Sequence, residues 1–538
     1  MMRRKLCLYF AILVALAAAA ADKPGFRVAG RIVNGLTGEP IAGAKVELGT
    51  TKGEEWVRVV RADSAGRFVF DGLRSGKYQL HGEFPGFYPK GFDQHDGGYM
   101  SAIVVGGAVD SEHLVFRLDP ACSISGYITD EFNEPVREAQ VFLFSRAVQN
   151  GKFSIHLLGQ DRTDDRGHFL MSPIEAGTKY IVVSARPWYS QVHWQNPQND
   201  NPADGDVNDV AFPTTFYPGT TEQNDAAPIE LHPGEATTAN ISLRSVRSVR
   251  LRIQNSSPGS RSAWLSQQIF DDFEMPIQAQ TRFIGQEQMV VTGFAPGRYT
   301  VHFRAGEQPG AEQEMDLNGD MTLDSTAALE VRNATITGLA RAEGATLNRS
   351  FVMFRDLESG RRDGAPIQPD GKFKVDSIPP GKYEVAVSNA TSVYLVNMAA
   401  SGAKTDGRTL TIPNGADVRM AMVVAKGVGH IEGTAMAGDK GEAGVLVLLV
   451  PEKPDEQNAL FRRDQSDSDG TFTLPNVVPG RYTLVAIEDG WQLQWLRPEI
   501  LSPYRAKGES VTIQPGGRYN FTVSVQKQIS NSKMMVGH

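Results

Sequence analysis

One pattern of residues recurs along this chain and constrains its fold more than any other feature. A glycine is followed by phenylalanine at +2, an apolar residue at +4, an aliphatic residue at +7, glycine at +10 and tyrosine at +12. The full pattern occupies residues 66–78, 371–383 and 470–482. Residues 167–180 keep it with the tyrosine one place later, and residues 287–299 keep only its second half. Five copies of one pattern predict five serial structural units.

The spacing within the pattern predicts two short β-strands. The residues at +2 and +4, such as Phe68 and Phe70, point to the same face of a strand, because side chains alternate with a period of two. Steps such as Pro479-Gly480 before the tyrosine predict a tight turn. We therefore expect a β-hairpin that buries one aromatic side chain on each arm.

Further strand-like segments surround each copy of the pattern. A step such as Ile124-Ser125-Gly126 precedes it, and an alternating segment such as residues 418–424 follows it. About seven short strands in roughly 100 residues are typical of an antiparallel β-sandwich. We predict an all-β chain, a tandem array of five antiparallel Ig-like or transthyretin-like sandwiches. Short joints between them predict a semi-rigid rod or a curved array.

The expected bounds of the units follow from the repeats. They are a signal peptide at 1–21, sandwiches at 22–119, 120–245, 246–332, 333–425 and 426–527, and a C-terminal tail at 528–538. The second sandwich carries an insertion at 187–227 that is rich in aromatic residues and aspartate, and the third is degenerate.

The motifs resemble those of a known family. Gly-x-[Ile/Val], Glu-Pro-[Ile/Val]-x-x-Ala-x-Val and Asp-x-x-Gly-x-Phe, followed by [Leu/Ile]-x-x-Gly-x-Tyr, are similar to those of the carboxypeptidase regulatory-like domain. The resemblance is close in the first, fourth and fifth units, good in the second and poor in the third. It implies a transthyretin-like sandwich related to collagen-adhesin B-type repeats and to starch-binding, carbohydrate-binding-like folds. Such modules serve as spacers, adhesins, enzyme appendages and sugar binders, so the resemblance specifies the fold rather than the function.

The first 21 residues have the features of a secretory signal peptide. Arg3, Arg4 and Lys5 precede an apolar run and an alanine-rich segment that ends at Ala21. The apolar run is short for a membrane span, which leaves a retained anchor as the alternative. We expect an exported protein, periplasmic, at the cell surface or extracellular, with no transmembrane segment once the signal is removed. The formal net charge of −8 argues against a nucleic-acid partner, which needs clustered cations.

The sequence gives little support for an enzyme. Cys122 is the one cysteine beyond the signal, so we expect a small buried side chain and no intrachain disulfide. His232 and Glu235 form the only His-x-x-Glu pair, and a Pro-Gly step separates them, unlike the helical ligand pairs of zinc hydrolases. We predict no catalytic residues and no cofactor, with a cryptic enzyme as the least favoured interpretation.

An acidic loop offers a weak calcium candidate. Asp204, Asp206 and Asn208 have the i, i+2, i+4 oxygen spacing that calcium loops use. Thr215 stands where such a loop needs a bidentate glutamate, so a solvated loop is the competing interpretation.

Aromatic residues in the loops after the repeat tyrosine are the candidates for ligand binding. Those that we single out are Trp188, Tyr189, Trp194, Tyr217, Trp491 and Trp495. Planar rings beside amides and carboxylates suit a sugar, whose C–H faces stack on rings while its hydroxyl groups form hydrogen bonds. The alternative is that the rings pack back onto the sandwich or at contacts between domains. Trp188 and Trp194 are the best candidates for exposed rings, because they lie in the insertion.

These features favour an exported, non-enzymatic protein for binding, adhesion or scaffolding, with a polysaccharide or cell-envelope glycan as its ligand. The alternative is an accessory or regulatory subunit that docks onto a secreted hydrolase or an outer-membrane transporter. The first hypothesis predicts affinity for isolated glycans, whereas the second predicts co-purification with other envelope proteins.

Overall fold

The computed structural model describes residues 25–529, except 52–55, 97, 108, 191–208, 255–260, 272, 285–287, 306–310, 325–331, 345, 348 and 389–392. Strands dominate these residues, and α1 (Pro498–Arg505) is the one α-helix among them. The strands form five two-layered units, each around its own hydrophobic core. The prediction of a tandem all-β array is confirmed. None of the described helices is long and apolar enough to cross a membrane.

The first unit packs a three-stranded sheet against a larger one. Its strands are β1 (Phe26–Asn34), β2 (Lys45–Thr50), β3 (Trp56–Arg61), β4 (Arg67–Leu73), β5 (Gly76–Glu83), β6 (Lys90–Gly91), β7 (Gln94–His95), β8 (Tyr99–Met100), β9 (Ile103–Val105) and β10 (Leu114–Leu118). One sheet has the order β10-β1-β4, and the other has the order β3-β2-β5-β6 with β9 beside β5. The short β7 and β8 pair with each other.

The second unit has the same two layers with longer strands. Its elements are β11 (Cys122–Thr129), β12 (Gln140–Gln149), β13 (Lys152–Arg162), β14 (His168–Ile174), β15 (Gly177–Ser184), β16 (Val210–Ala211), β17 (Thr215–Phe216), the 3₁₀ turn η1 (Gln223–Asp225), β18 (Ile229–Leu231), β19 (Ala236–Thr238) and β20 (Ile241–Ser242). The sheets are β14-β11-β19, with β20 also on β11, and β13-β12-β15-β17, with β18 also on β15.

The third unit keeps two four-stranded sheets although its motif is degenerate. Its strands are β21 (Val246–Arg247), β22 (Val249–Gln254), β23 (Arg261–Ile269), β24 (Phe273–Pro276), β25 (Gln280–Ile284), β26 (Gln288–Phe294), β27 (Gly297–Ala305), β28 (Ala311–Leu317) and β29 (Met321–Asp324). The sheets are β25-β26-β22-β29 and β24-β23-β27-β28, and β21 pairs with β16 of the second unit.

The fourth unit repeats this plan. Its strands are β30 (Ala334–Glu343), β31 (Phe351–Asp356), β32 (Arg362–Pro366), β33 (Lys372–Ile378), β34 (Gly381–Ser388), β35 (Val393–Ser401), β36 (Lys404–Asp406), β37 (Thr409–Ile412) and β38 (Asp417–Lys426). The sheets are β33-β30-β38-β35 and β32-β31-β34-β37-β36.

The fifth unit joins its two layers along one edge. Its elements are β39 (Gly429–Ala437), β40 (Lys440–Gly441), β41 (Leu446–Pro451), η2 (Asn458–Leu460), β42 (Arg462–Gln465), β43 (Thr471–Val477), β44 (Gly480–Ile487), η3 (Gly490–Gln492), α1, β45 (Glu509–Ile513) and β46 (Arg518–Gln526). The strand order is β40-β39-β46-β44-β41-β42, with β43 on β39 and β45 on β44.

At least one strand pair in each unit departs from the expected antiparallel pattern. Apart from β21, which pairs with the second unit, the first strand of each unit runs parallel to its last, as β30 does to β38 and β39 does to β46. The same holds for β1 and β10, β11 and β20, and β22 and β29. In the second unit β11 also runs parallel to β19, whereas the other described pairs of the two main sheets in the first four units are antiparallel.

The alternation predicted from the motif is confirmed by burial. Phe472 and Leu474, at +2 and +4, are 1% and 0% exposed, and the +7 residue Val477 is fully buried. Gly433 of the preceding strand lies directly opposite Phe472. A Cβ atom on Gly433 would lie 2.5 Å from Cζ of Phe472, so the glycine makes room for the phenylalanine ring. In the degenerate third unit both the glycine and the phenylalanine are replaced: Ile253 stands at the glycine position and lies opposite Met289 at the phenylalanine position.

The expected β-hairpin is wrong, because the two arms of the motif belong to opposite sheets. β43 pairs with β39, whereas the following β44 pairs with β41 and β45. The chain therefore crosses from one layer to the other through two residues, Val478 and Pro479. This crossing brings the phenylalanine of one sheet and the tyrosine of the other into one core, which a hairpin within a single sheet would not do.

The side chain of the repeat tyrosine stabilises the segment in which the chain crosses between the sheets. The hydroxyl group of Tyr482 donates to the carbonyl oxygen of Val478 at 2.7 Å, and burial raises the pKa of Tyr482 to about 12. Equivalent bonds run from Tyr78 to Arg74, from Tyr299 to Ala295 and from Tyr383 to Pro379. Each tyrosine thus satisfies a backbone carbonyl that the turn leaves without a strand partner.

The second unit uses lysine instead, which corrects the expected one-residue slip of its tyrosine. Lys179 stands at the +12 position, is 2% exposed, and donates to the carbonyl oxygen of Ala176 at 3.2 Å. It also lies 3.2 Å from Oγ of Ser145, and burial lowers its pKa. Tyr180 points to the other face of β15, where it packs against Phe270 of the third unit.

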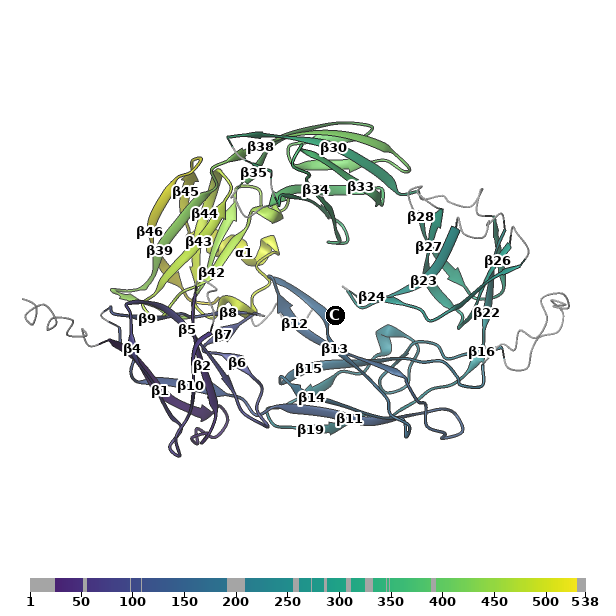
Figure 1. The fold of residues 1–538 in the computed structure, drawn as a ribbon, viewed down its shortest axis with the longest axis horizontal. Coiled ribbons are helices and arrows are strands. Elements are labelled where there is room, and N and C mark those ends of the chain that lie inside the picture. The colour runs from purple at the N-terminus through teal and green to yellow at the C-terminus, as the bar shows by residue number, and fades with distance from the viewer. Residues whose placement is uncertain are drawn as a thin grey trace, which may run out of the picture.

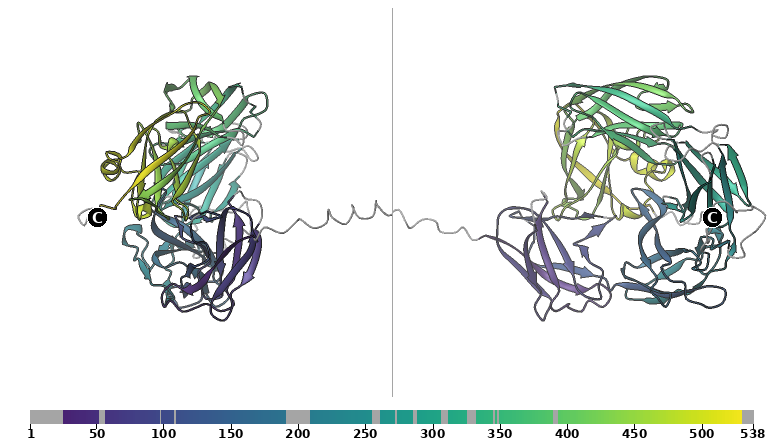
Figure 2. Two further views of the ribbon diagram at one scale, coloured as in Figure 1. Left: turned by 90° about the vertical axis from the view of Figure 1, so that its left-hand side faces the viewer. Right: turned by 45° about the vertical axis from the view of Figure 1, so that its right-hand side comes forward.

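The five units follow one another around a closed ring (Figure 1). The chain passes through them in order, from the first (purple) to the fifth (yellow), and the fifth returns to the first. Two further views show the same neighbours (Figure 2). The curvature expected for an array of short joints therefore continues until the ends meet.

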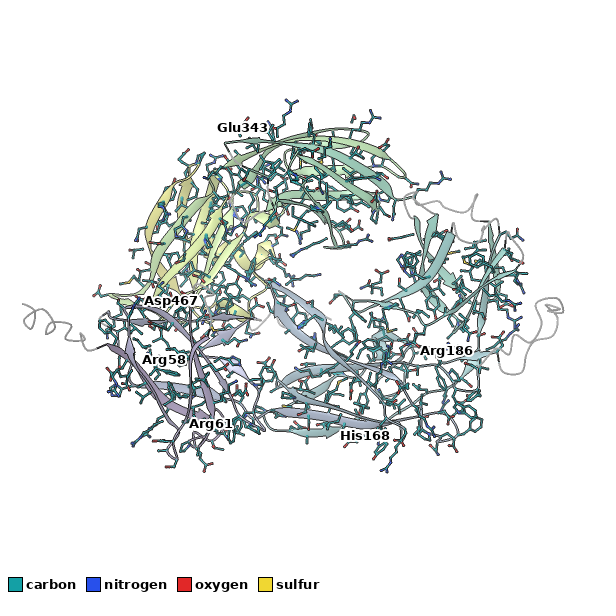
Figure 3. The ribbon with its side chains drawn as sticks, viewed as in Figure 1. Arg58, Arg61, His168, Arg186, Glu343 and Asp467 are labelled. Atoms are coloured by element: carbon teal, nitrogen blue, oxygen red, sulfur yellow. The ribbon has the colours of Figure 1, made fainter. Side chains whose placement is uncertain are left out.

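A buried polar contact between the first and fifth units closes the ring. Lys77 Nζ lies 2.5 Å from a carboxylate oxygen of Asp467, a residue labelled in Figure 3 where the two units meet. The other oxygen of Asp467 accepts the backbone N–H of Ala102 at 2.8 Å. Gln465 donates to the backbone carbonyl of Asp93 at 2.6 Å. These groups are satisfied by one another, as buried polar groups must be for a stable contact.

Arg463 joins three units at this place. Its guanidinium pairs with Asp96 of the first unit and donates to Asn150 of the second at 2.6 Å. It also lies over the ring of Tyr99, 4.5 Å from the centroid. The side chains of Arg463 and Asp96 are only 12% and 5% exposed, so each depends on the other for its charge partner.

We predict that Gly433→Ala destabilises the fifth unit by about 1–3 kcal/mol, because the added methyl group collides with the buried ring of Phe472. Thermal unfolding of the purified chain measures this. Gly159→Ala is the control, since a Cβ atom at Gly159 meets no atom within 4 Å. Equal melting curves for the two variants would contradict the role of Gly433.

We predict that Arg463→Ala destabilises the closed ring by about 3–5 kcal/mol, because it leaves the buried carboxylate of Asp96 without its partner. The readout is the first transition in a thermal melt, which shifts to lower temperature. Arg481→Ala, which removes an exposed pair with Glu452, is the matched control and leaves that transition unchanged. An unaltered first transition in Arg463→Ala would rule out this contribution.

Candidate functional site

The insertion of the second unit provides the most exposed aromatic ring among those predicted ligand residues that the structure describes. Trp188 is 77% exposed, and its ring meets that of Tyr189 edge to face at 5.7 Å between centroids. The two residues lie four and five positions after the end of β15 at Ser184. This strand therefore sets the position at which the insertion leaves the sandwich. Tyr189 is partly buried, and burial raises its pKa. The edge-to-face contact supports the indole while leaving it open to solvent.

A cavity of about 370 Å³ lies beside Trp188. Asp130, Glu134, Arg137 and Arg186 contribute two carboxylates and two guanidinium groups to its wall. Oδ1 of Asp130 already accepts the backbone N–H groups of residues 132 and 134, both at 2.9 Å. The wall therefore has balanced charge and offers both donors and acceptors next to an open indole face.

Tyr217 does not join this cavity. It packs against the core of the second unit as a partly buried side chain, and its backbone is held by bonds to Ile181 and Ala227. Trp194 lies outside the described residues, as do the calcium candidates Asp204, Asp206 and Asn208. The first residue after that gap, Asp209, pairs with Arg250 and Ser248 of the third unit.

Trp491 and Trp495 are not exposed platforms, which corrects their assignment as ligand residues. They are 4% and 5% exposed. Trp491 stacks on His95 of the first unit at 5.5 Å between centroids and donates from Nε1 to the carbonyl oxygen of Gly444 at 3.0 Å. Trp495 lies against Phe461, and the neighbouring Leu496 N–H donates to Gly151 of the second unit. Packing at contacts between domains, the alternative weighed for these rings, is what the structure shows.

The cysteine and the His-x-x-Glu pair considered in the sequence analysis both lie in the second unit. Cys122 is fully buried and its thiol lies 3.0 Å from the carbonyl oxygen of His232. His232 and Glu235 form an exposed ion pair within one turn, 3.0 Å apart. Among the residues that the structure describes, no three His, Cys, Asp or Glu side chains are grouped to hold a metal ion.

A cluster of charged residues around His302, which the sequence did not reveal, lies where the third and fourth units meet. Nε2 of His302 is 2.9 Å from Glu274, and Nδ1 is 3.7 Å from Glu312. Glu312 in turn pairs with Arg361 of the fourth unit at 3.1 Å. Trp264 covers the imidazole, with 4.9 Å between ring centroids and an interplanar angle of 4°.

The two carboxylates set the charge of this imidazole. Burial on its own lowers the pKa of His302, but the neighbouring carboxylates of Glu274 and Glu312 outweigh burial and raise it to about 9. The hydrogen bond from His302 lowers the pKa of Glu274 to about 2. His302 is therefore a cation at neutral pH, and it links charges of the third unit to Arg361.

We predict that this junction loses stability in alkali. A histidine whose pKa is raised in the folded state stabilises it fully below the unfolded pKa of 6.5, and this contribution disappears as the pH rises through about 9. The melting temperature measured between pH 6.5 and 9.5 therefore falls in the wild type and falls less in His302→Gln. His113→Gln, at a side chain 84% exposed, is the control and keeps the wild-type slope. Identical slopes for His302→Gln and the wild type would contradict this assignment.

Family comparisons identify two of the five units. Residues 27–97 match the carboxypeptidase regulatory-like domain, and residues 428–501 match the second β-sandwich domain of BOS complex subunit NOMO1-like proteins. The resemblance that the repeat motif indicated is thereby confirmed for the first unit, and the match of the fifth unit to another β-sandwich domain is consistent with it. No curated protein matches the chain.

Three solved structures that are similar to the chain come from bacterial proteins. The Bacillus anthracis TIE protein is 12% identical with a TM-score of 0.17, over 94% of this chain and 69% of that one. GBS52, the minor pilin of Streptococcus agalactiae, is 13% identical with a TM-score of 0.20, over 41% and 96%. The shaft pilin SpaA of Lactobacillus rhamnosus GG is 9% identical with a TM-score of 0.18, over 41% and 98%. The fold itself rests on the sheets and cores described above.

Proposed function

We propose that the chain is an exported, non-enzymatic protein whose ring of sandwiches is a scaffold that binds carbohydrate of the cell envelope. The single observation that carries this proposal is the exposed indole of Trp188 beside a cavity of balanced charge. An indole face stacks on the C–H groups of a sugar ring. The guanidinium and carboxylate groups of Arg186 and Glu134 can then bond to the hydroxyl groups at its edge.

The closed ring supports a scaffolding role. Each unit is fixed to its neighbours by contacts that include buried side chains, such as Glu384, whose two carboxylate oxygens both accept the N–H of Ala459 at 3.0 Å. Burial raises the pKa of Glu384, and this bond opposes that rise. A site on one unit is therefore held at a fixed position relative to the rest of the ring, which favours binding to an extended ligand.

A second candidate is an accessory protein that docks onto a secreted hydrolase or an outer-membrane transporter. Phe132, 74% exposed, lies in the turn that carries Asp130 and Glu134 beside the Trp188 cavity. Two exposed aromatic side chains near arginines are also typical of a protein interface. This candidate predicts that Trp188 and Phe132 both contribute to capture of a protein partner and that isolated glycans do not bind.

We predict that Trp188→Ala weakens binding to envelope polysaccharide about tenfold or more, which corresponds to a loss of about 1.4 kcal/mol or more. Binding is measured by titration calorimetry on the full chain, first across a glycan panel and then with the variants. Trp188→Tyr restores part of the affinity because it keeps an aromatic face.

The matched control is Trp264→Ala, which removes another partly exposed tryptophan from the third unit, outside the cavity. It leaves glycan affinity unchanged. Failure of every glycan in the panel to bind, or equal affinity of the wild type and Trp188→Ala, would contradict the carbohydrate proposal. Co-purification of a larger protein that is lost in both Trp188→Ala and Phe132→Ala would favour the docking candidate.

A further inference from the structure

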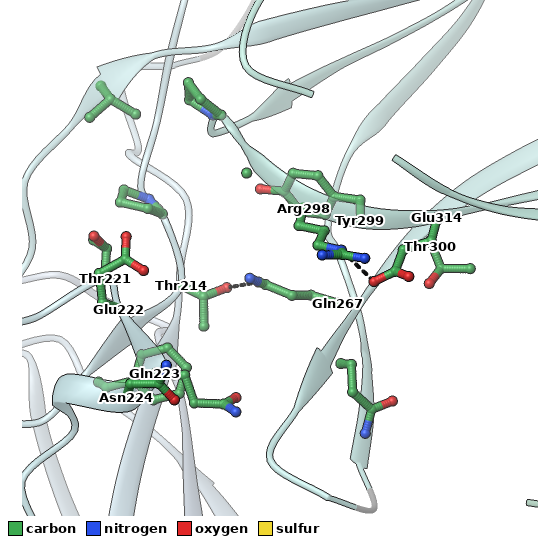
Figure 4. A pocket seen from close by; sticks show the side chains of 16 residues that line it. Thr214, Thr221, Glu222, Gln223, Asn224, Gln267, Arg298, Tyr299, Thr300 and Glu314 are labelled. Carbon is green, nitrogen blue, oxygen red and sulfur yellow. Dashed lines mark hydrogen bonds and ion pairs between the residues drawn. The ribbon is translucent and has the colours of Figure 1, made fainter. Parts of the chain in front are cut away.

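A second cavity lies between the second and third units and has a distinct lining. It encloses about 730 Å³, in the range of small-molecule sites. The second unit contributes the far end of its insertion, and the third contributes the β23 and β27 strands (Figure 4). Neither Trp188 nor any other residue of the first cavity lines it.

Neutral polar groups dominate the wall of this cavity. Four residues with side-chain amides and three threonines belong to the lining: Gln223, Asn224, Gln267, Gln268, Thr214, Thr221 and Thr300. An amide both donates and accepts hydrogen bonds, and so does a hydroxyl group. Such a wall complements a ligand whose own groups are both donors and acceptors, as sugar hydroxyl groups are.

The charged groups of the wall exclude an anionic ligand. Arg298 is the one cation of the lining, and Nε of Arg298 lies 2.5 Å from Glu314. Glu222 adds a second carboxylate without adding a cation. A phosphate or a uronic acid would therefore meet net negative charge, whereas a neutral saccharide meets no such opposition.

The wall is held in place by the contact between the two units. The tip of the β23–β24 hairpin inserts Phe270 among Phe144, Tyr180 and Phe216 of the second unit, at 5.0, 5.2 and 5.7 Å between ring centroids. The backbone N–H of Phe270 donates to Oε1 of Gln223 at 2.8 Å.

One hydrogen bond also crosses the cavity wall directly. The hydroxyl group of Thr214 donates to Oε1 of Gln267 at 2.7 Å (Figure 4). These bonds orient two of the amides before any ligand arrives, and a site ordered in advance loses less conformational entropy on binding.

We propose that this cavity is a second ligand site, specific for a neutral saccharide unit. It goes beyond the Trp188 site of the proposed function, because its residues, its lining chemistry and its selectivity are its own. Amides and hydroxyl groups from two units hold the sugar, and the absence of an unpaired cation from the lining directs the selectivity toward uncharged residues of a polysaccharide.

The test uses the full chain with maltohexaose, cellohexaose and chitohexaose as neutral probes and with oligogalacturonate and inorganic phosphate as anionic ones. Calorimetric titrations are run on the wild type, on Gln267→Leu, on Thr214→Val and on Trp188→Ala. Gln280→Leu, a glutamine of the third unit outside the lining, is the matched control. Thermal melts establish that each variant is folded.

We expect at least one neutral hexasaccharide to bind, with affinity about five- to tenfold weaker in Gln267→Leu and in Thr214→Val, because each removes one hydrogen-bonding group. Gln280→Leu retains wild-type affinity. The hexasaccharide whose affinity falls in Gln267→Leu still binds to Trp188→Ala. Binding that is lost only in Trp188→Ala would overturn this proposal and leave the proposed function standing. Binding of the anionic probes at this cavity, or of no probe at all, would also overturn it.

Discussion

The contact between the first and fifth sandwiches is the constraint on which the arrangement of the whole chain depends. The junctions along the chain join successive units, whereas this one sets Lys77 against Asp467, residues separated by nearly four hundred positions. Asp467 is buried and Lys77 is partly buried, and the carboxylate also accepts the backbone N–H of Ala102, so the desolvated charge has partners. The chain itself holds the two partners close, so a polar contact of limited extent is enough to keep the ring closed.

Much of each sandwich follows from residues that can be read in the sequence. The period of two predicted which side of the Phe472 strand is buried, because a strand offers only two faces. The sequence also predicted a buried Cys122 and the resemblance of the first unit to the carboxypeptidase regulatory-like domain. It also marked Trp188 as an exposed ring, because the insertion of the second unit adds residues that the shared core does not need.

The features that the sequence did not reveal depend on contacts between distant segments. Nothing local distinguishes a hairpin from a crossing between sheets, because the choice depends on which strands pair with Thr471–Val477 and Gly480–Ile487. The sequence predicted that Tyr180 takes the role of the repeat tyrosine. In the structure Lys179 takes that role, because it is Lys179 that lies on the inner face of β15. Trp491 resembles a ligand platform in the sequence, but closing of the ring buries it against His95. The charge on His302 likewise depends on Glu274 and Glu312, which are brought together only by the sheet.

Closure of the ring fixes the relative positions of the units that form the two cavities, and scattering tests this closure most directly. Small-angle X-ray scattering of the wild-type chain in dilute solution gives the distribution of distances within one molecule. The ring in Figure 1, with its first and fifth sandwiches in contact, predicts a narrow distribution of distances that ends without a long tail. A long tail in that distribution, as for five sandwiches arranged in an open row, would contradict it.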